Sequence, residues 1–214
     1  MRITVFGAAG SVGSRIVAEA LQRGHEVTAV VRDAARFGEL PPGARHRTGD
    51  ASVAADVTAL GAGQNLVVGA TRPAAGREDD HGATATGLLA GLAGTGVRLL
   101  VVGGAGSLVV RDSGKPVYDD PRYVPAAWRG IALASVRQFE VFRNAGTAAV
   151  DWTYLSPPAL LEPGARTGTY RAGRDELLVD AAGRSEISVE DLAVAVLDEA
   201  EHPRRRGRRF TVAY

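Results

Sequence analysis

The stretch Val5-Phe6-Gly7-Ala8-Ala9-Gly10-Ser11-Val12-Gly13 decides the fold of this chain. Residues 2–6 are mostly apolar and β-branched, which predicts a short buried strand that ends at Gly7. Apolar residues then recur at helical spacing until Gly24, and residues 25–31 have the composition of a second strand. Strand, glycine turn, helix and strand together predict one βαβ unit of a parallel sheet.

The three glycines of this stretch have distinct physical uses. Gly7 permits a tight turn, Gly10 leaves room for backbone to meet a pyrophosphate, and Gly13 lets the helix approach the sheet. Phosphates would then face the free N–H groups at the start of the helix. The pattern therefore predicts dinucleotide binding, with a ligand-free glycine-rich turn as the alternative. The predicted phosphate-binding residues are Gly7, Ala9, Gly10, Ser11, Val12 and Gly13.

The end of the second strand distinguishes between the two nicotinamide cofactors. NAD sites usually carry an acidic residue there, whereas NADP sites have an arginine for the 2′-phosphate. Arg32 stands at this place, and Arg36 lies one turn further on if the segment is helical. We therefore expect NADP(H) to be preferred over NAD(H). In the alternative, both arginines are solvated and Asp33 caps a helix.

The glycine turn and the sequence V-V-R-D-x-x-R resemble the atypical short-chain dehydrogenase/reductases. The closest resemblance is to NAD(P)H-binding proteins of the NmrA-like and flavin reductase (biliverdin reductase B) type. Weaker matches extend it over nearly the whole chain, at residues 49–50, 69–72, 102–108, 156–158 and 187–192. The resemblance implies that Asp50 contacts the adenine and that Pro157, Pro158 and Ala159 line the nicotinamide pocket. The residues themselves also allow Asp50 or Ser52 to cap a helix over 52–60.

Hydrophobic patterning predicts a single α/β domain over residues 1–214. Further strands are expected at 45–48, 65–69, 97–102 and 150–155, with helices between them. The Rossmann-type sheet would be doubly wound and mainly parallel, in the order 3-2-1-4-5-6, with the segment 210–214 as an added strand. The apolar and aromatic stripe from Trp128 to Phe142 predicts a core-facing helix. Residues 156–187 are expected to shape a small substrate pocket.

Composition narrows the classes of function. The chain of 214 residues has no cysteine and a net charge of +1, so thiolate metal sites and general attraction to nucleic acid are not expected. No run approaches the ~20 apolar residues of a membrane helix. Met1 leads directly into a strand, so we expect no signal peptide and a cytoplasmic location. We further expect a monomer or weak homodimer that acts on a small molecule, with no metal, membrane or nucleic-acid partner.

The ends of the fourth and fifth strands should complete the site, because ligands bind there in open α/β sheets. The residues expected to lie close to the cofactor are Gly69, Ala70, Thr71, Gly103 and Gly104. A bulky side chain at Gly104 is expected to displace the nicotinamide ring. Many reductases of the resembled superfamily place a Ser or Thr at the fifth strand and a Tyr-x-x-x-Lys beyond it, and this chain has neither.

The remaining candidates for a proton donor lie outside the strands. They are His81, Ser107, Tyr118 and Tyr123. His81 has a competing structural interpretation, as part of an acidic helix start that favours the helix dipole. Residues 108–127 predict either a lid over a flat ligand or a packed surface loop. Tyr118, Tyr123 and Trp128 make this region amphipathic, as a lid over a flat ligand would be.

The leading hypothesis is an NADPH-dependent oxidoreductase that transfers hydride to a small planar acceptor, such as a flavin, a quinone or a related carbonyl compound. The alternatives are an NADP-binding redox-sensing regulator without turnover and a tailoring isomerase or dehydratase of secondary metabolism.

Overall fold

The computed structural model describes residues 1–74, 76–78 and 80–214 of the chain. Within this part of the chain, eight strands form one sheet in the order β3-β2-β1-β4-β5-β6-β10-β8. The strands are β1 (Arg2–Phe6), β2 (Glu26–Val31), β3 (Arg45–Thr48), β4 (Leu66–Gly69), β5 (Arg98–Val102), β6 (Trp152–Ser156), β8 (Arg171–Gly173) and β10 (Arg208–Ala213). All neighbours pair in parallel except β8, which is antiparallel to β10. The predicted order and the added C-terminal strand are confirmed.

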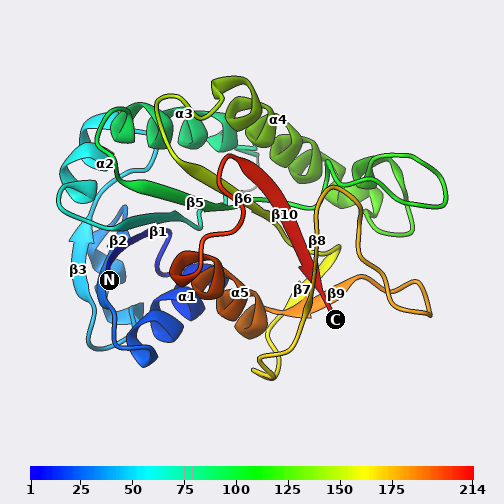
Figure 1. The fold of residues 1–214 in the computed structure, drawn as a ribbon, viewed down its shortest axis with the longest axis horizontal. Coiled ribbons are helices and arrows are strands. Elements are labelled where there is room, and N and C mark those ends of the chain that lie inside the picture. Colours follow the sequence, from blue (N-terminus) through cyan, green and yellow to red (C-terminus); the bar gives the residue numbers. More distant parts are fainter. Residues whose placement is uncertain (75, 79) are drawn as a thin grey trace.

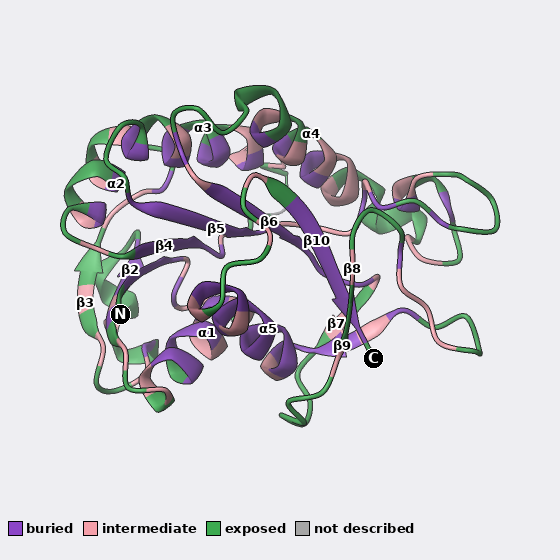
Figure 2. Cartoon of the chain, in the orientation of Figure 1, coloured by how far each residue is buried: buried purple, intermediate pink, exposed green. Residues whose placement is uncertain are grey.

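Helices cover both faces of this sheet (Figure 1). One layer contains α1 (Ser11–Gln22) and α5 (Val189–Glu201), and the other contains α2 (Ala54–Gly61), α3 (Asp80–Leu92) and α4 (Arg129–Ala145). The strands and the inner faces of the helices are buried (Figure 2). Each face of the sheet thus has its own apolar core, as expected for a parallel sheet whose strands are apolar on both faces.

Two helix starts show how local chemistry sets the element boundaries. The hydroxyl of Ser188 accepts a hydrogen bond from the backbone N–H of Asp191 and caps α5. Capping of α2 by Asp50 or Ser52 is wrong, because α2 begins at Ala54 with Val53 as its N-cap and without a side-chain cap. Asp50 instead accepts hydrogen bonds from the backbone N–H and hydroxyl of Ser52, which close a tight turn.

The first turn of α4 departs from the predicted core stripe. Phe142 is buried, but Trp128, which precedes α4, is 52% exposed. The polar side chains of Ser135 and Gln138 are buried on the inner face instead. Gln138 accepts a hydrogen bond from the Tyr154 hydroxyl of β6 at 3.0 Å, which satisfies both groups inside the core. The expectation that Trp128 belongs to the core is therefore wrong.

Residues 108–127 form a packed loop with a small core of its own. Leu108, Val110 and Val117 are buried together with Leu177. Short 3₁₀ turns at Val117–Asp119 and Ala126–Trp128 organise the segment. The packed-loop alternative is therefore correct for its first half.

A second, two-stranded sheet lies in the segment expected to shape the substrate pocket. β7 (Leu160–Glu162) and β9 (Glu186–Ser188) pair in parallel, and β9 leads directly into α5. In the same segment, β8 extends the main sheet.

A buried ion pair ties the end of α5 to the middle of the sheet. Arg98 of β5 donates to the Glu199 carboxylate at 2.9 Å and to the Thr153 hydroxyl at 3.1 Å. The same carboxylate accepts the backbone N–H groups of Arg204 and Arg205. The first part of the basic run 204–209 thus forms the turn into β10, and one buried carboxylate organises it.

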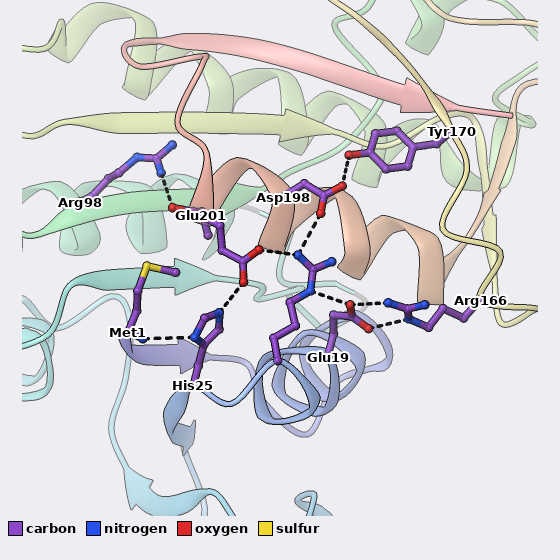
Figure 3. Close-up of polar contacts among 10 residues, drawn as sticks. Met1, Glu19, His25, Arg98, Arg166, Tyr170, Asp198 and Glu201 are labelled. Atoms are coloured by element: carbon purple, nitrogen blue, oxygen red, sulfur yellow. Dashed lines mark hydrogen bonds and ion pairs between the residues drawn. The ribbon is translucent and has the colours of Figure 1, made fainter.

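A second polar network joins the far ends of α1 and α5 (Figure 3). Arg23 contacts Glu19, Asp198 and Glu201 at 2.8–2.9 Å. His25 contacts Glu201 at 2.7 Å, and its other ring nitrogen lies 3.1 Å from the N-terminal amine. These contacts join the C-terminal ends of the two helices, and the glycine turn lies at the opposite end of α1.

Removal of the Glu199 carboxylate is expected to destabilise the protein strongly. Glu199 is 2% exposed, so Glu199→Ala leaves the Arg98 charge buried without its partner. We expect the free energy of unfolding in urea to fall by about 3 to 5 kcal/mol. The matched control is Glu140→Ala on α4, whose exposed carboxylate lies 3.8 Å from Arg143 and should change stability by less than about 0.5 kcal/mol. Equal small losses for both variants would contradict this role of Glu199.

Candidate functional site

The carboxyl ends of the parallel strands open into one cleft of about 1380 Å³. Its lining follows the order of the strands, from Arg32 after β2, through Gly7 after β1 and Thr71 after β4, to Gly103 after β5 and Pro157 after β6. Neighbouring strands lie ~4.8 Å apart, so the cleft crosses roughly 19 Å of sheet from β2 to β6. It is long enough to hold an extended ligand.

The glycine turn is a tight junction of three elements. Gly7 has a φ of 81°, and a Cβ there would lie 2.4 Å from the carbonyl oxygen of Ala70 beyond β4. A Cβ on Gly13 would lie 2.1 Å from the carbonyl oxygen of Gly7. Any side chain at these positions would push α1 or β4 away, so both glycines are required by geometry.

The start of α1 offers unused hydrogen-bond donors to the cleft. Gly10 is the N-cap of α1 and has no side chain with which to satisfy the first N–H groups. No acidic side chain occupies the first turn, and Ser11 and Val12 line the cleft there. Free N–H groups and the positive end of the helix dipole suit a pyrophosphate. The residues present therefore fit a dinucleotide.

Arg32 and Arg36 both line the β2 end of the cleft, but they differ in their partners. Arg36 contacts Glu39 at 2.6 Å and donates to the carbonyl of Ala9 at 3.0 Å. Among the described residues, Arg32 has no hydrogen bond or ion pair, and its side chain is exposed. Asp33 caps the 3₁₀ turn Ala34–Glu39 by accepting from the backbone N–H of Ala35. At the β2 end of the cleft, Arg32 is thus free to meet an incoming anion.

Asp50 lines the same end of the cleft and is ionised. Burial alone would raise the pKa of its carboxyl, but the hydrogen bonds from Ser52 and the nearby charges of Arg32 and Arg77 hold that pKa below its usual range. The carboxylate can therefore accept hydrogen bonds from a ligand at neutral pH.

Two glycines after β5 line the cleft with their backbone atoms. A Cβ added to either of them would point into the protein interior. A Cβ on Gly103 would lie 1.8 Å from the Tyr154 hydroxyl oxygen, and a Cβ on Gly104 would lie 2.6 Å from Ser135 of α4. Added bulk at Gly104 would press on α4. The expectation that it would displace the nicotinamide ring directly is therefore corrected.

Most of the predicted cofactor residues share the cleft. Those that line it are Gly7, Ala9, Gly10, Ser11, Val12, Arg32, Arg36, Asp50, Ala70, Thr71, Gly103, Gly104, Pro157 and Pro158. Gly13 and Gly69 lie behind this lining. Gly13 packs on the glycine turn, and a Cβ on Gly69 would lie 2.9 Å from the Leu88 side chain of α3.

Two of the four predicted proton donors line the cleft. His81 and Tyr123 line the cleft, whereas Ser107 and Tyr118 are not part of its described lining. The Ser107 hydroxyl accepts a hydrogen bond from Arg209 at 2.6 Å, in a contact that fixes the loop after β5. The Tyr123 hydroxyl donates to the Gly183 carbonyl at 3.2 Å across the entrance.

His81 lies in the first turn of α3 and is 6% exposed. Its Nδ1 atom is buried and has no hydrogen-bond partner. Burial, with a smaller contribution from the Arg72 charge, lowers the pKa of the imidazole to about 4. The ring is therefore neutral at pH 7, and its chemistry in the cleft is that of a neutral hydrogen-bonding group.

The lining also includes residues outside the predicted cofactor and proton-donor sets. Leu160 and residues 183–186 line the cleft, and they lie within the segment 156–187 that was expected to shape the substrate pocket. Trp128, which the lid interpretation involves, lines the cleft as well, and the Arg72 guanidinium lies 5.3 Å from the centre of its ring. The helical spacing of apolar residues had also placed Trp128 in the core stripe.

The NAD(P)H-binding family profile matches residues 7–203. The chain belongs to this family. It is 40% identical to the Bacillus subtilis protein YwnB, over 99% of this chain and 98% of that protein. A Burkholderia pseudomallei structure named as an exported protein shares 38% identity and a TM-score of 0.88, with both chains fully covered. A Streptococcus pneumoniae structure named as an NADH-flavin reductase shares 28% identity and a TM-score of 0.87, covering 100% of this chain and 99% of that one.

These relatives confirm the resemblance at the level of the family and of the Rossmann-type fold. They support a nucleotide-dependent oxidoreductase in general terms. Within the described ranges, no helix has the length and apolarity needed to cross a membrane.

The buried neutral His81 predicts a specific dependence of stability on pH. Its pKa is about 4 in the folded protein and about 6.5 in the unfolded chain, so the unfolded state gains the proton first as the pH falls. Stability is therefore lost between about pH 6.5 and pH 4. From pH 7.5 to pH 5 we expect His81 to contribute a loss of about 2 kcal/mol in the free energy of unfolding.

The measurement compares urea unfolding of the wild type and His81→Leu at both pH values, because carboxylates that titrate in both proteins cancel in the difference. The variant should lose about 2 kcal/mol less than the wild type on acidification. An identical loss in both proteins would mean that His81 has an ordinary pKa.

Proposed function

We propose that this protein is an NADPH-dependent reductase of the atypical short-chain dehydrogenase/reductase type. The observation that carries the proposal is the continuous cleft that joins the phosphate-binding turn at β1 to an apolar region beyond β6. A dinucleotide that enters at the turn has room to extend across the ends of β4 and β5. Its reactive end would then lie beside Pro157 and Pro158, next to space for a second molecule.

When bound, the reduced nicotinamide supplies a hydride, and the reduced acceptor takes up one proton from water. The chain itself contributes binding and orientation. The first turn of α1 would hold the pyrophosphate, and Asp50 would accept hydrogen bonds at the adenosine end. Gly103, Gly104 and the two prolines would form the wall against which the reacting rings are positioned.

A flavin, a quinone or a related planar carbonyl compound suits such a site as acceptor, because solvent can protonate its reduced form. His81 is neutral at pH 7 with a pKa of about 4, so it is a poor general acid. Tyr154 lies under Gly103, and burial raises its pKa far above neutrality. These features favour hydride transfer without a dedicated proton donor.

We place the protein in the cytoplasm, since the chain has no cysteine, and we expect it to act on a small molecule as a monomer or weak homodimer. The experiment that tests the function is NADPH oxidation by the purified protein with panels of flavins, quinones and simple carbonyl compounds. NADPH binding without oxidation by any panel would replace the proposal with a redox-sensing regulator.

Arg32 is expected to set the preference for NADPH. A charge-assisted contact with the 2′-phosphate is worth about 1.5–3 kcal/mol, so Arg32→Ala should weaken NADPH binding roughly ten- to a hundredfold. NADH binding should change little. The measurement is titration of the bound nicotinamide's fluorescence with both cofactors. Arg45→Ala, an exposed arginine of β3 outside the described lining of the cleft, is the matched control and should match the wild type. Equal losses of NADPH and NADH affinity would contradict this assignment.

Removal of the side-chain hydroxyl or imidazole groups should leave turnover nearly intact. A positioned general acid contributes ~10²–10⁴-fold to the rate. We expect Tyr123→Phe, Ser107→Ala and His81→Gln each to lower kcat for the best acceptor by less than about tenfold, near 1.4 kcal/mol of transition-state stabilisation. The measurement is steady-state NADPH oxidation at saturating cofactor. A hundredfold fall in kcat for one variant, with unchanged NADPH affinity, would identify that residue as the acid.

A further inference from the structure

The exposed indole of Trp128 overhangs the cleft. Gly106, in the loop after β5, packs so closely on α4 that a Cβ there would lie 2.4 Å from the Ala132 carbonyl oxygen. The first turn of α4 is thereby held against the ends of the strands. Trp128 precedes that turn by one residue, so the helix carries the indole past the strand ends to the cleft, which it lines.

The backbone and one face of this indole are held in place. Trp128 ends a 3₁₀ turn that Pro125 begins, and the backbone N–H of Trp128 donates to the Pro125 carbonyl at 2.9 Å. Arg72, from the loop after β4, lies over the ring at 5.3 Å from its centre. Among the described residues Arg72 has no ion pair, so the indole is its partner. Because the side chain is still 52% exposed with Arg72 in place, much of the indole remains open to a ligand.

A second exposed apolar side chain lines the cleft, on the strand β7. Leu160 of β7 is 46% exposed and lines the same cleft, and β7 pairs with β9 directly before α5. Six large hydrophobic residues are exposed in the described part of the chain, and of these only Trp128 and Leu160 line the cleft. Exposed apolar surface collected inside a cleft indicates a ligand that covers it.

Most of the charged side chains near this region already have partners. Arg122 is paired with Asp112 and Asp120 at 2.6–2.7 Å, and Arg184 is paired with Asp180 at 2.8 Å. His81 is uncharged at neutral pH. Among the described residues Arg72 is the exception, because it lies against the Trp128 ring without an ion pair and leaves a positive charge at this end.

We infer that Trp128 is the stacking platform of the acceptor site and that it selects planar, conjugated rings. A flat ring would lie against the open part of the indole, with Leu160 and the prolines after β6 closing the apolar slot. This inference rests on the proposed function, because only a reductase has an acceptor. Binding of a flat ring to Trp128 can nevertheless be measured without any reaction.

Binding of two planar probes without reduced cofactor tests the inference. Riboflavin is a neutral tricyclic ring whose own fluorescence is quenched when it stacks on an indole, and menadione is a neutral bicyclic quinone that calorimetry can follow. We expect Trp128→Leu to weaken riboflavin binding roughly tenfold and to abolish the quenching. Trp128→Phe, which keeps an aromatic face, should recover most of the affinity.

The other tryptophan provides the matched control. Trp152 is 4% exposed in the core, and its Nε1–H donates to the Gly146 carbonyl at 2.6 Å. Trp152→Phe should bind and quench riboflavin like the wild type, once circular dichroism shows that it is folded. NADP⁺ affinity should change less than twofold in all three variants.

Three results would overturn the inference. They are a wild type that binds neither probe at millimolar concentration, unchanged riboflavin affinity in Trp128→Leu, and a parallel loss of NADP⁺ affinity in that variant. Trp128-dependent binding without NADPH oxidation would uphold the stacking site and refute the reductase function. NADPH oxidation with the same acceptor KM in the wild type and Trp128→Leu would uphold the function and refute the site.

Discussion

The contact of α1 with the turn after β1 is the constraint on which the site depends. A Cβ at Gly13 would stand 2.1 Å from the Gly7 carbonyl oxygen, and a Cβ at Gly7 would stand 2.4 Å from that of Ala70. Three backbone segments therefore meet with no side chain between them. This close approach places the uncapped N–H groups of α1 beside the end of β4, so that the phosphate-binding turn and the rest of the cleft are continuous.

Different kinds of interaction fix the two ends of α1. Near the turn, backbone packing, the contact of Arg36 with the Ala9 carbonyl and the ion pair of Arg15 with Glu190 hold the helix, and none of them uses its first N–H groups. At the other end, Arg23 bridges three carboxylates of α1 and α5, and Arg166 adds two contacts to Glu19 at 2.8 Å (Figure 3). Strong polar contacts are thus concentrated away from the cleft. Had they been placed at the turn, they would have occupied the groups that the ligand needs.

The fold was predictable because its determinants are local. Strand, glycine turn and helix follow one another within residues 2–22, and the observed strand order is that of the Rossmann-type class which this unit indicates. The cap of α5 was equally readable, since Ser188 and Asp191 stand at capping spacing. The cap of α2 was not, because Asp50 can accept hydrogen bonds either from a helix or from its own turn. In the structure Asp50 bonds to Ser52 within its own turn, and Val53 is therefore the N-cap of α2.

The cofactor end of the cleft was predictable for the same reason, whereas the acceptor end depends on contacts between distant segments. Gly104 faces Ser135, thirty-one residues later, so its role as a packing glycine is invisible in the sequence. Helical periodicity placed Trp128 on the face of Phe142, but periodicity describes only the direction of a side chain around an axis. It does not report where the supporting sheet ends. Since α4 begins beyond the strand ends, the apolar face that is core at Phe142 becomes a ligand-facing surface at Trp128.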